Sequence, residues 1–487
     1  MLHVSSLPSP YGIGSFGASA RRWVDFLRDA GQSYWQILPL NPTGDGDSPY
    51  QSFSAFAGNS YFIDLDSLCE EGLLKREEYA GLRWGSNEKM VDFGLVHKSR
   101  ELVLRKAFSR FSDNAGLDVF ISENPWLDNY CLFLVIKEQQ KLLPWMEWDK
   151  PLRKRDPEVL EQIRNKVSAD LRYHAFVQYK FVSQWSALRA YANGKQVEII
   201  GDIPIYASLD SADVWSNPEL FQVGVNGYPI EVSGCPPDSF SVDGQIWGNP
   251  VYDWEAMERS DYQWWRQRLR SSFDFYDVLR IDHFRGLESY FSIPYGANTA
   301  TKGKWRLGPG KGFIDAIKET LPDARIIAED LGFLTDEVRN LLAYSGYPGM
   351  KLLQYAFDSR EVGDYIPYGY TANTVAYTGT HDNDTVLGWS KNAPKECIQE
   401  AMEYMGLRRR SDLPNGMIRL VMQSASGLAM IPMQDWLGLG SEARMNTPST
   451  VGGNNWRWRL GKGDVNGKLA EKMARMTAMY GRIKKGG

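Results

Sequence analysis

Several chemical signatures are missing from the 487 residues of this chain. Its four cysteines, Cys69, Cys131, Cys235 and Cys397, are far apart and form no CxxC pair, so we expect free thiols in a reducing compartment. The chain has five histidines but no HxH or HExxH sequence, and it lacks the GxSxG and GxxxxGK(S/T) sequences as well. The sequence therefore has no motif to support nucleophilic-serine chemistry, and none to support phosphate binding by a GxxxxGK(S/T) loop.

Membrane and nucleic-acid partners are also disfavoured by what the sequence lacks. No apolar run is long enough to span a bilayer, and Met1 is not followed by the charged and apolar regions of a secretory signal. The chain has 55 lysines and arginines against 60 aspartates and glutamates, and this net charge of −5 does not favour a nucleic-acid or anionic-membrane surface. We expect a cytoplasmic monomer or homodimer, or a plastid protein if a transit peptide was removed.

Aromatic residues, by contrast, are abundant, with 17 tryptophans and 25 tyrosines. Most of them should pack in the core. A surplus of Trp and Tyr also suits stacking on sugar rings, whose C–H faces are apolar and whose edges need hydrogen bonds. The composition is therefore compatible with a carbohydrate ligand.

Short apolar segments alternate with helical patterns along the chain, as parallel strands covered on both faces do. Seven such segments lie at 34–40, 197–206, 276–284, 325–332, 349–357, 374–385 and 428–436, and residues 2–7 would supply an eighth. Repeated strand–helix units imply right-handed crossovers and a parallel sheet. We therefore predict an α/β fold, a (β/α)8 TIM barrel with long loops over its C-terminal face.

Two stretches interrupt this alternation. Residues 67–169 are rich in charge and helical patterns, so we predict a mainly helical insertion subdomain between strands 2 and 3, with residues 1–66 and 170–487 forming the catalytic barrel. Residues 216–255 contain Pro, Gly and aromatics, and we interpret them as a long functional loop rather than a domain.

Polar side chains collect at the carboxyl ends of four predicted strands, where barrel enzymes place their reacting groups. They are Asp202, Arg280, Asp282, Glu329, His381 and Asp382. Arg280 and Asp282 share a face of their strand, so the arginine can hold Asp282 ionised and lower its pKa. Glu329 follows an apolar segment, which tends to raise a carboxyl pKa, as a general acid requires. One charged and one protonated carboxyl group is the combination that glycoside chemistry uses.

Each of these features also has an ordinary structural explanation. Arg-x-Asp is often a salt bridge, Glu-Asp at a strand end is often a helix cap, and HDND is often a polar turn. Their joint occurrence at four strand ends favours a catalytic site. A metal-dependent barrel hydrolase remains an alternative because Asp, Glu and His bind metals, although His283 and His381 follow different strands.

The chain resembles the 4-α-glucanotransferase branch of the α-amylase superfamily, the amylomaltases or disproportionating enzymes. The motifs that carry the resemblance cover nearly the whole chain, and together they are highly specific. They are SLPSPYGIGSFG (6–17), WQILPLNPT (35–43), DSPYQSFSAFAGN (47–59), GDIPIYASLDSADVW (201–215), GQIWGNPVYDW (244–254), LRIDHFRG (279–286), IIAEDLG (326–332), GTHDND (379–384) and RMNTPSTVGGNNWRWRL (444–460).

The resemblance implies a retaining transfer of α-1,4-glucan segments between maltooligosaccharides, starch or glycogen fragments. Asp282 would be the nucleophile, Glu329 the general acid and then the base, and Asp382 would grip sugar hydroxyls in the transition state. A retaining pair of carboxyl groups stands about 5–5.5 Å apart. No metal or organic cofactor is implied.

Five further residues are expected to bind substrate. The resemblance implies that Tyr50 stacks on the donor ring, Asp202 binds the same sugar, Trp247 forms the acceptor side, Arg280 positions Asp282 and His381 assists Asp382. Two alternatives remain: an α-1,4-glucan hydrolase of the same superfamily, which would use the same catalytic residues with water as the acceptor, and a non-catalytic carbohydrate-binding or scaffold barrel, which would normally have lost one of the carboxylates. The presence of all three carboxylates argues against the second.

Overall fold

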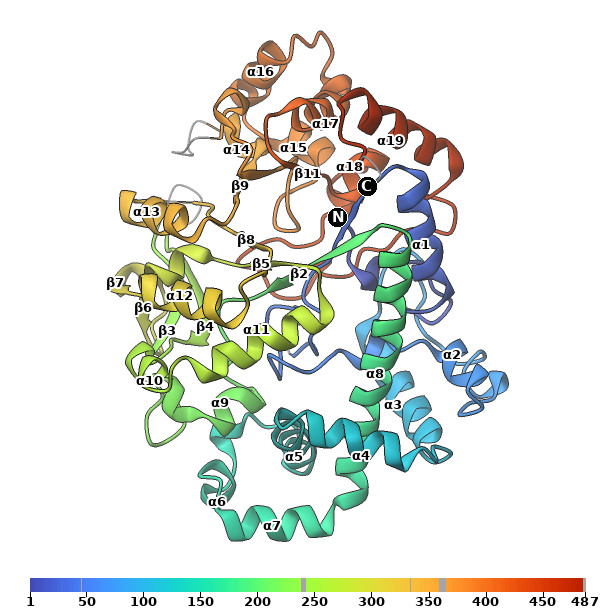
Figure 1. Cartoon of the computed structure of the whole chain (residues 1–487), viewed down its shortest axis with the longest axis vertical. Coiled ribbons are helices and arrows are strands. Elements are labelled where there is room, and N and C mark those ends of the chain that lie inside the picture. Colours follow the sequence, from blue (N-terminus) through green and yellow to red (C-terminus); the bar gives the residue numbers. More distant parts are fainter. Residues whose placement is uncertain (45, 238–241, 333, 359–364, 485–487) are drawn as a thin grey trace.

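Seven parallel strands form the centre of the molecule (Figure 1). The computed structural model describes residues 1–44, 46–237, 242–332, 334–358 and 365–484. The strand order is β1-β2-β5-β8-β9-β10-β11, and every neighbouring pair is parallel. The strands are β1 (Tyr34–Gln36), β2 (Glu198–Ile203), β5 (Val278–Ile281), β8 (Ile326–Ala328), β9 (Gly349–Leu352), β10 (Thr374–Tyr377) and β11 (Leu428–Met430). Each lies inside one of the seven predicted segments and in the predicted order, so the barrel prediction is confirmed.

The predicted eighth strand, residues 2–7, is wrong in its secondary structure but lies where such a strand would lie. Residues Val4–Ser6 form a 3₁₀ helix. Just before it, Leu2 N donates to Gln36 O at 3.0 Å, and Met1 N donates to Ile431 O at 2.8 Å. The first two residues therefore connect β1 with the chain that follows β11, and the turn at Val4 ends the pairing before a strand can form.

Helices cover the outside of the barrel, in the expected alternation with the strands (Figure 1). Those that follow or precede the barrel strands are α1 (Ala18–Asp29), α8 (Ser168–Gly194), α11 (Gln263–Phe275), α12 (Gly310–Thr320), α13 (Asp336–Ser345), α14 (Leu353–Ala356), α15 (Val386–Asn392), α16 (Lys395–Tyr404), α17 (Leu413–Gln423), α18 (Met433–Leu437) and α19 (Gly467–Met479). Within the described residues, none of the helices combines the length and the apolar character that crossing a membrane requires.

The stretch 67–169 is mainly helical. It contains α3 (Phe93–Phe108), α4 (Asn114–Glu123), α5 (Trp126–Gln139), α6 (Lys150–Arg153) and α7 (Pro157–Lys166), and α2 (Leu65–Glu70) lies at its start. Buried Lys137 of α5 forms an ion pair with Asp210, in the loop after β2, so this stretch is tied to the C-terminal face of the barrel. The division into a barrel and an insertion subdomain stays a prediction.

The stretch 216–255 is not simply a long loop, and this interpretation is wrong. It contains β3 (Glu231–Cys235) and β4 (Gln245–Pro250), with the short helices α9 (Ala212–Ser216) and α10 (Trp254–Arg259) at its two ends. The strands β3 and β4 form an antiparallel sheet with β6 (Ser289–Pro294) and β7 (Lys304–Leu307), in the order β4-β3-β6-β7. The strands that complete this sheet come after β5, so no local pattern could reveal the pairing. Residues 238–241 of the stretch lie outside the described residues.

Close packing of Tyr276 against strand β2 explains the glycine at position 201, next to Asp202. Gly201 precedes Asp202 in β2, and a Cβ atom at Gly201 would lie 2.1 Å from Cγ of Tyr276. Any larger residue would push the Tyr276 ring away from the strand. The small residue lets the ring cover β2 directly beside Asp202.

Candidate active site

A buried Asp–Arg–Asp chain lies at the ends of β2 and β5. Asp202 and Arg280 are partners in the register of these strands. Arg280 Nη1 donates to both Asp202 oxygens, at 2.7 and 2.6 Å, and Arg280 Nη2 lies 3.0 Å from Asp282 Oδ1. Asp202 is 1% exposed and Arg280 4%. The permanently charged guanidinium thus occupies the position between the two carboxylates and fixes both of them.

Glu329, after β8, is held from the neighbouring strand end. Glu329 Oε2 accepts a hydrogen bond from His283 N at 2.7 Å, and Oε1 accepts one from Leu331 N at 2.9 Å. His283 directly follows Asp282 and has a left-handed backbone with φ of 49°. This uncommon conformation turns its N–H toward Glu329. The residue after the predicted nucleophile therefore positions the predicted acid.

The pKa directions agree with the sequence for Glu329 and disagree for Asp282. Burial raises the pKa of Glu329, as predicted, while Arg280 and the two amide hydrogen bonds oppose the rise. Burial also raises the pKa of Asp282 well above its usual value. Arg280 acts in the predicted direction, but burial together with the charges of Glu329, Asp202 and Asp382 outweighs it. Two coupled carboxyl groups in such a site retain one proton between them to a higher pH than a free carboxyl group would.

Tyr50 connects this chain of charges to His381. The Tyr50 hydroxyl donates to Asp202 Oδ2 at 2.7 Å, and the Tyr50 ring stacks on His381 with centroids 5.0 Å apart and an interplanar angle of 15°. Burial raises the pKa of Tyr50, so its hydroxyl stays a hydrogen-bond donor. Tyr50 is thereby held between the β2 and β10 sides of the site.

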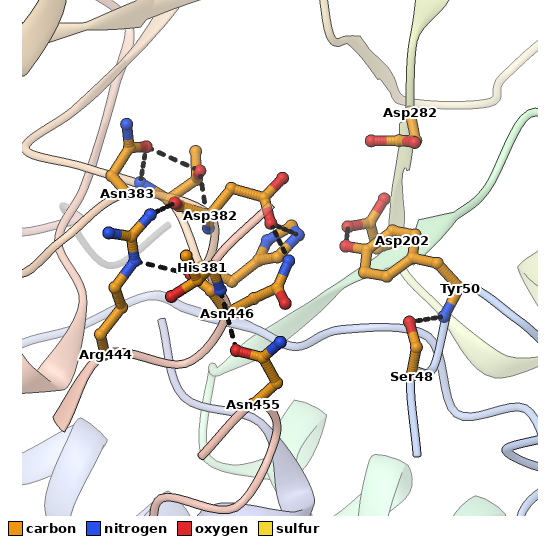
Figure 2. A network of polar contacts seen from close by, with 12 residues as sticks. Ser48, Tyr50, Asp202, Asp282, His381, Asp382, Asn383, Arg444, Asn446 and Asn455 are labelled. Carbon is orange, nitrogen blue, oxygen red and sulfur yellow. Dashed lines mark hydrogen bonds and ion pairs between the residues drawn. The ribbon is translucent and has the colours of Figure 1, made fainter. Parts of the chain in front are cut away.

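Asp382 reaches the site from the turn after β10. His381 Nε2 lies 3.4 Å from Asp382 Oδ1, and burial lowers the pKa of His381, so the imidazole is neutral. Asp382 is 47% exposed and Asp282 28%, whereas the groups behind them are buried. In Figure 2 these two carboxylates point toward one another, so both are accessible to a ligand between them.

Trp247 lies in β4 of the antiparallel sheet and contacts the site indirectly. Its ring packs edge-on against His283, with centroids 4.8 Å apart, and its Nε1 donates to Gln245 Oε1 at 3.1 Å. Because His283 holds Glu329, this contact joins Trp247 to the carboxyl pair. The structure thus links all eight predicted site residues in one network.

Three residues of this network were not predicted individually. Arg444 and Asn446 donate hydrogen bonds to Asp382, and Trp456 packs against Tyr50 and His381 at 5.9 and 5.8 Å between ring centroids. All three belong to the motif at 444–460, which was the only signal for them. Nothing in the motif itself says which of its side chains point toward Asp382.

Metal ligation has no prearranged site in the part of the chain that the structure describes, where no group of three or more His, Cys, Asp or Glu side chains could hold an ion. His283 and His381 follow β5 and β10, and the cationic position between Asp202 and Asp282 is taken by Arg280. Burial lowers the pKa of His283 to about 4.

Known proteins match this chain over nearly its full length. A family model described as 4-alpha-glucanotransferase matches residues 2–463. A 4-alpha-glucanotransferase of Clostridium butyricum is 48% identical and covers 99% of this chain and 100% of its own, and one of Streptococcus pneumoniae is 48% identical over 99% and 97%. An amylomaltase from Streptococcus agalactiae, solved in complex with acarbose, is 41% identical with a TM-score of 0.96, covering 99% of this chain and 98% of its own.

Proposed function

Because this chain belongs to the 4-alpha-glucanotransferase family, we propose that it transfers α-1,4-glucan segments by retaining double displacement through a covalent glucosyl–Asp282 intermediate. The observation that carries the mechanism is the arrangement of Asp282 and Glu329. Asp282 is bound by the fixed Arg280, and Glu329 is buried and accepts a hydrogen bond from the main-chain amide of His283, the residue after Asp282. The pair can hold one proton, which is what one nucleophile and one acid require.

In the first step, Asp282 attacks C1 of the glucan while Glu329 protonates the leaving glycosidic oxygen. The C1–O bond breaks, the shorter glucan leaves with its new hydroxyl group, and C1 becomes bonded to an Asp282 oxygen. In the second step, Glu329, now ionised, takes the proton from the 4-OH of an acceptor glucan. That oxygen attacks C1 and releases Asp282.

The surrounding groups bind the sugar at the cleaved bond. Tyr50 and Asp202 form a fixed pair in which the Tyr50 hydroxyl donates its proton to Asp202, so both residues can accept hydrogen bonds from the sugar hydroxyls. Asp382 and the neutral His381 face it from the β10 side and strengthen their hold as the ring distorts. The Streptococcus agalactiae amylomaltase was solved in complex with acarbose, which supports a glucan-like ligand for this protein.

A hydrolase would use the same carboxyl groups, so products must separate the two functions. We expect pure maltotriose, incubated with the enzyme and a chelator, to give glucose plus a ladder of longer maltooligosaccharides. The number of reducing ends should stay nearly constant because each transfer forms one glycosidic bond for every bond broken. Shortened sugars with a matching rise in reducing ends would contradict transfer, and loss of activity with the chelator would point to a metal-dependent hydrolase.

Replacing Trp247 with alanine should lower transfer more than cleavage. The ring packs against His283, whose amide holds Glu329, so it lies beside the carboxyl pair, where we expect an acceptor glucan to displace water. Loss of an aromatic contact costs about 1–3 kcal/mol, so we expect the transfer-to-hydrolysis ratio to fall about tenfold. Tyr295→Ala, an exposed aromatic after β6 of the same sheet, is the matched control and should leave the ratio unchanged. An unchanged ratio in Trp247→Ala would contradict the acceptor role.

A further inference from the structure

Asp382 is held in place by the segment from Arg444 to Asn446, which begins 62 residues later in the sequence. Asn446 Nδ2 donates to Asp382 Oδ1 at 2.7 Å, and Arg444 Nη2 donates to the main-chain oxygen of Asp382 at 2.6 Å. Figure 2 shows both side chains reaching the turn after β10. One short segment therefore fixes the carboxylate and the backbone of the same residue.

The segment is itself rigid. Arg444 Nε donates to Asn446 O at 2.7 Å, and Asn446 N donates to His381 O at 3.0 Å. On the other side of the turn, Asn383 Oδ1 accepts hydrogen bonds from Thr380 N at 2.9 Å and Thr380 Oγ1 at 2.8 Å. The turn is thus bound from both sides, and the Asn446 amide starts from a fixed main chain.

Asn446 provides the only short hydrogen bond to the Asp382 carboxylate among the described residues. The other nearby group, His381 Nε2, is 3.4 Å from the same oxygen. Both contacts are to Oδ1, while the side chain stays half exposed. The amide orientation follows from this contact, because an Asn446 oxygen in that place would face a carboxylate oxygen.

We propose that Asn446 is a positioning residue, whose neutral amide fixes Asp382 Oδ1 and so aims the carboxylate at the sugar hydroxyls in the transition state. A neutral donor fixes the oxygen without cancelling the charge that strengthens those hydrogen bonds. This inference rests on the proposed role of Asp382 in the transfer reaction. It extends the site to a residue that acts through Asp382.

A double-mutant cycle tests the inference on the disproportionation of maltotriose. We expect Asn446→Ala to lower kcat about 10- to 150-fold with little change in KM, since a hydrogen bond to a charged group contributes about 1.5–3 kcal/mol. Asp382→Ala should lower kcat much further, and adding Asn446→Ala to it should cost less than twofold more, because the interaction is already gone.

The control is Asn455→Ala, in the same loop. Asn455 accepts a hydrogen bond from Thr447 N at 3.0 Å and donates to Thr450 O at 3.2 Å, without a described contact to Asp382. It should change kcat less than threefold. If the Asn446 loss persists in full in the Asp382→Ala background, the positioning role is wrong while the proposed function stands. If Asp382→Ala is nearly as active as the unmodified enzyme, the proposed role of Asp382 itself fails.

A pH profile provides a readout that a merely structural role would not change. In Asn446→Asp, one proton shared with Asp382 can replace the lost amide donor at acid pH. As the pH rises, the pair loses this proton and repels. We expect the ratio of the kcat of Asn446→Asp to the kcat of Asn446→Ala to be highest near pH 5 and to fall below one near pH 8. A ratio that does not vary with pH would overturn the proposal.

Discussion

Replacing Asp282 with alanine should lower transfer from maltotriose by about four orders of magnitude or more, the range in which removal of an enzymic nucleophile falls. No other described carboxylate can replace it. Asp202 is bound on both oxygens by Arg280, and Asp382 comes from the opposite side of the site. The measurement is the rate of glucose release from maltotriose, with circular dichroism and thermal unfolding to show that the fold is kept. Asp336→Asn, at the exposed start of α13, is the control and should be fully active.

An added nucleophile distinguishes loss of the attacking group from general damage. With α-maltosyl fluoride as donor and azide in solution, the space left in Asp282→Ala admits azide to the face of C1 that Asp282 attacks. The product should be β-maltosyl azide, because a single displacement inverts the α configuration. Formation of the α-azide, or no rescue in a folded variant, would contradict Asp282 as the nucleophile.

The strand-end residues could be predicted because local sequence determines strands, and parallel strands of a barrel end at one face. Asp202, Arg280, Asp282 and Glu329 each follow or end a short apolar segment, so their convergence needs only the fold. The pairing of Asp202 with Arg280 also needed the register of β2 and β5, which no pattern in either strand specifies.

The contacts of Asp382 and Trp247 could not be predicted in the same way. Asn446 reaches Asp382 from a loop 64 residues later in the sequence. Trp247 belongs to a sheet in which two strands precede β5 in the sequence and two follow it. The pKa of Asp282 was predicted in the wrong direction because only Arg280 is its neighbour in sequence. Its net shift also depends on burial and on carboxylates from three other strand ends.

Glu329→Ala should separate donors that need an acid from donors that do not. The glucose or maltose released from maltotriose is a poor leaving group unless its oxygen is protonated, so we expect the kcat on maltotriose to fall about 10²- to 10⁴-fold, the usual contribution of general acid catalysis. Fluoride departs without protonation, so formation of the intermediate from α-maltosyl fluoride should be nearly unchanged. Azide should then give α-maltosyl azide, because it attacks the Asp282-bound sugar in a second displacement. A β-azide from this variant would reverse the assignment of the two carboxyl groups.

The pH dependence follows from the same assignment. The acid form of Glu329 is needed in the first step, and burial raises its pKa. Because Asp282 and Glu329 hold one proton between them, activity on maltotriose is lost as the pH rises and the pair gives up that proton, above the range of an ordinary glutamate. With α-maltosyl fluoride, Glu329→Ala should show no such loss over the same range, because the group that titrates is absent and the donor needs no proton. A decline identical to that of the unmodified enzyme on maltotriose would assign the basic limb of the profile to another residue.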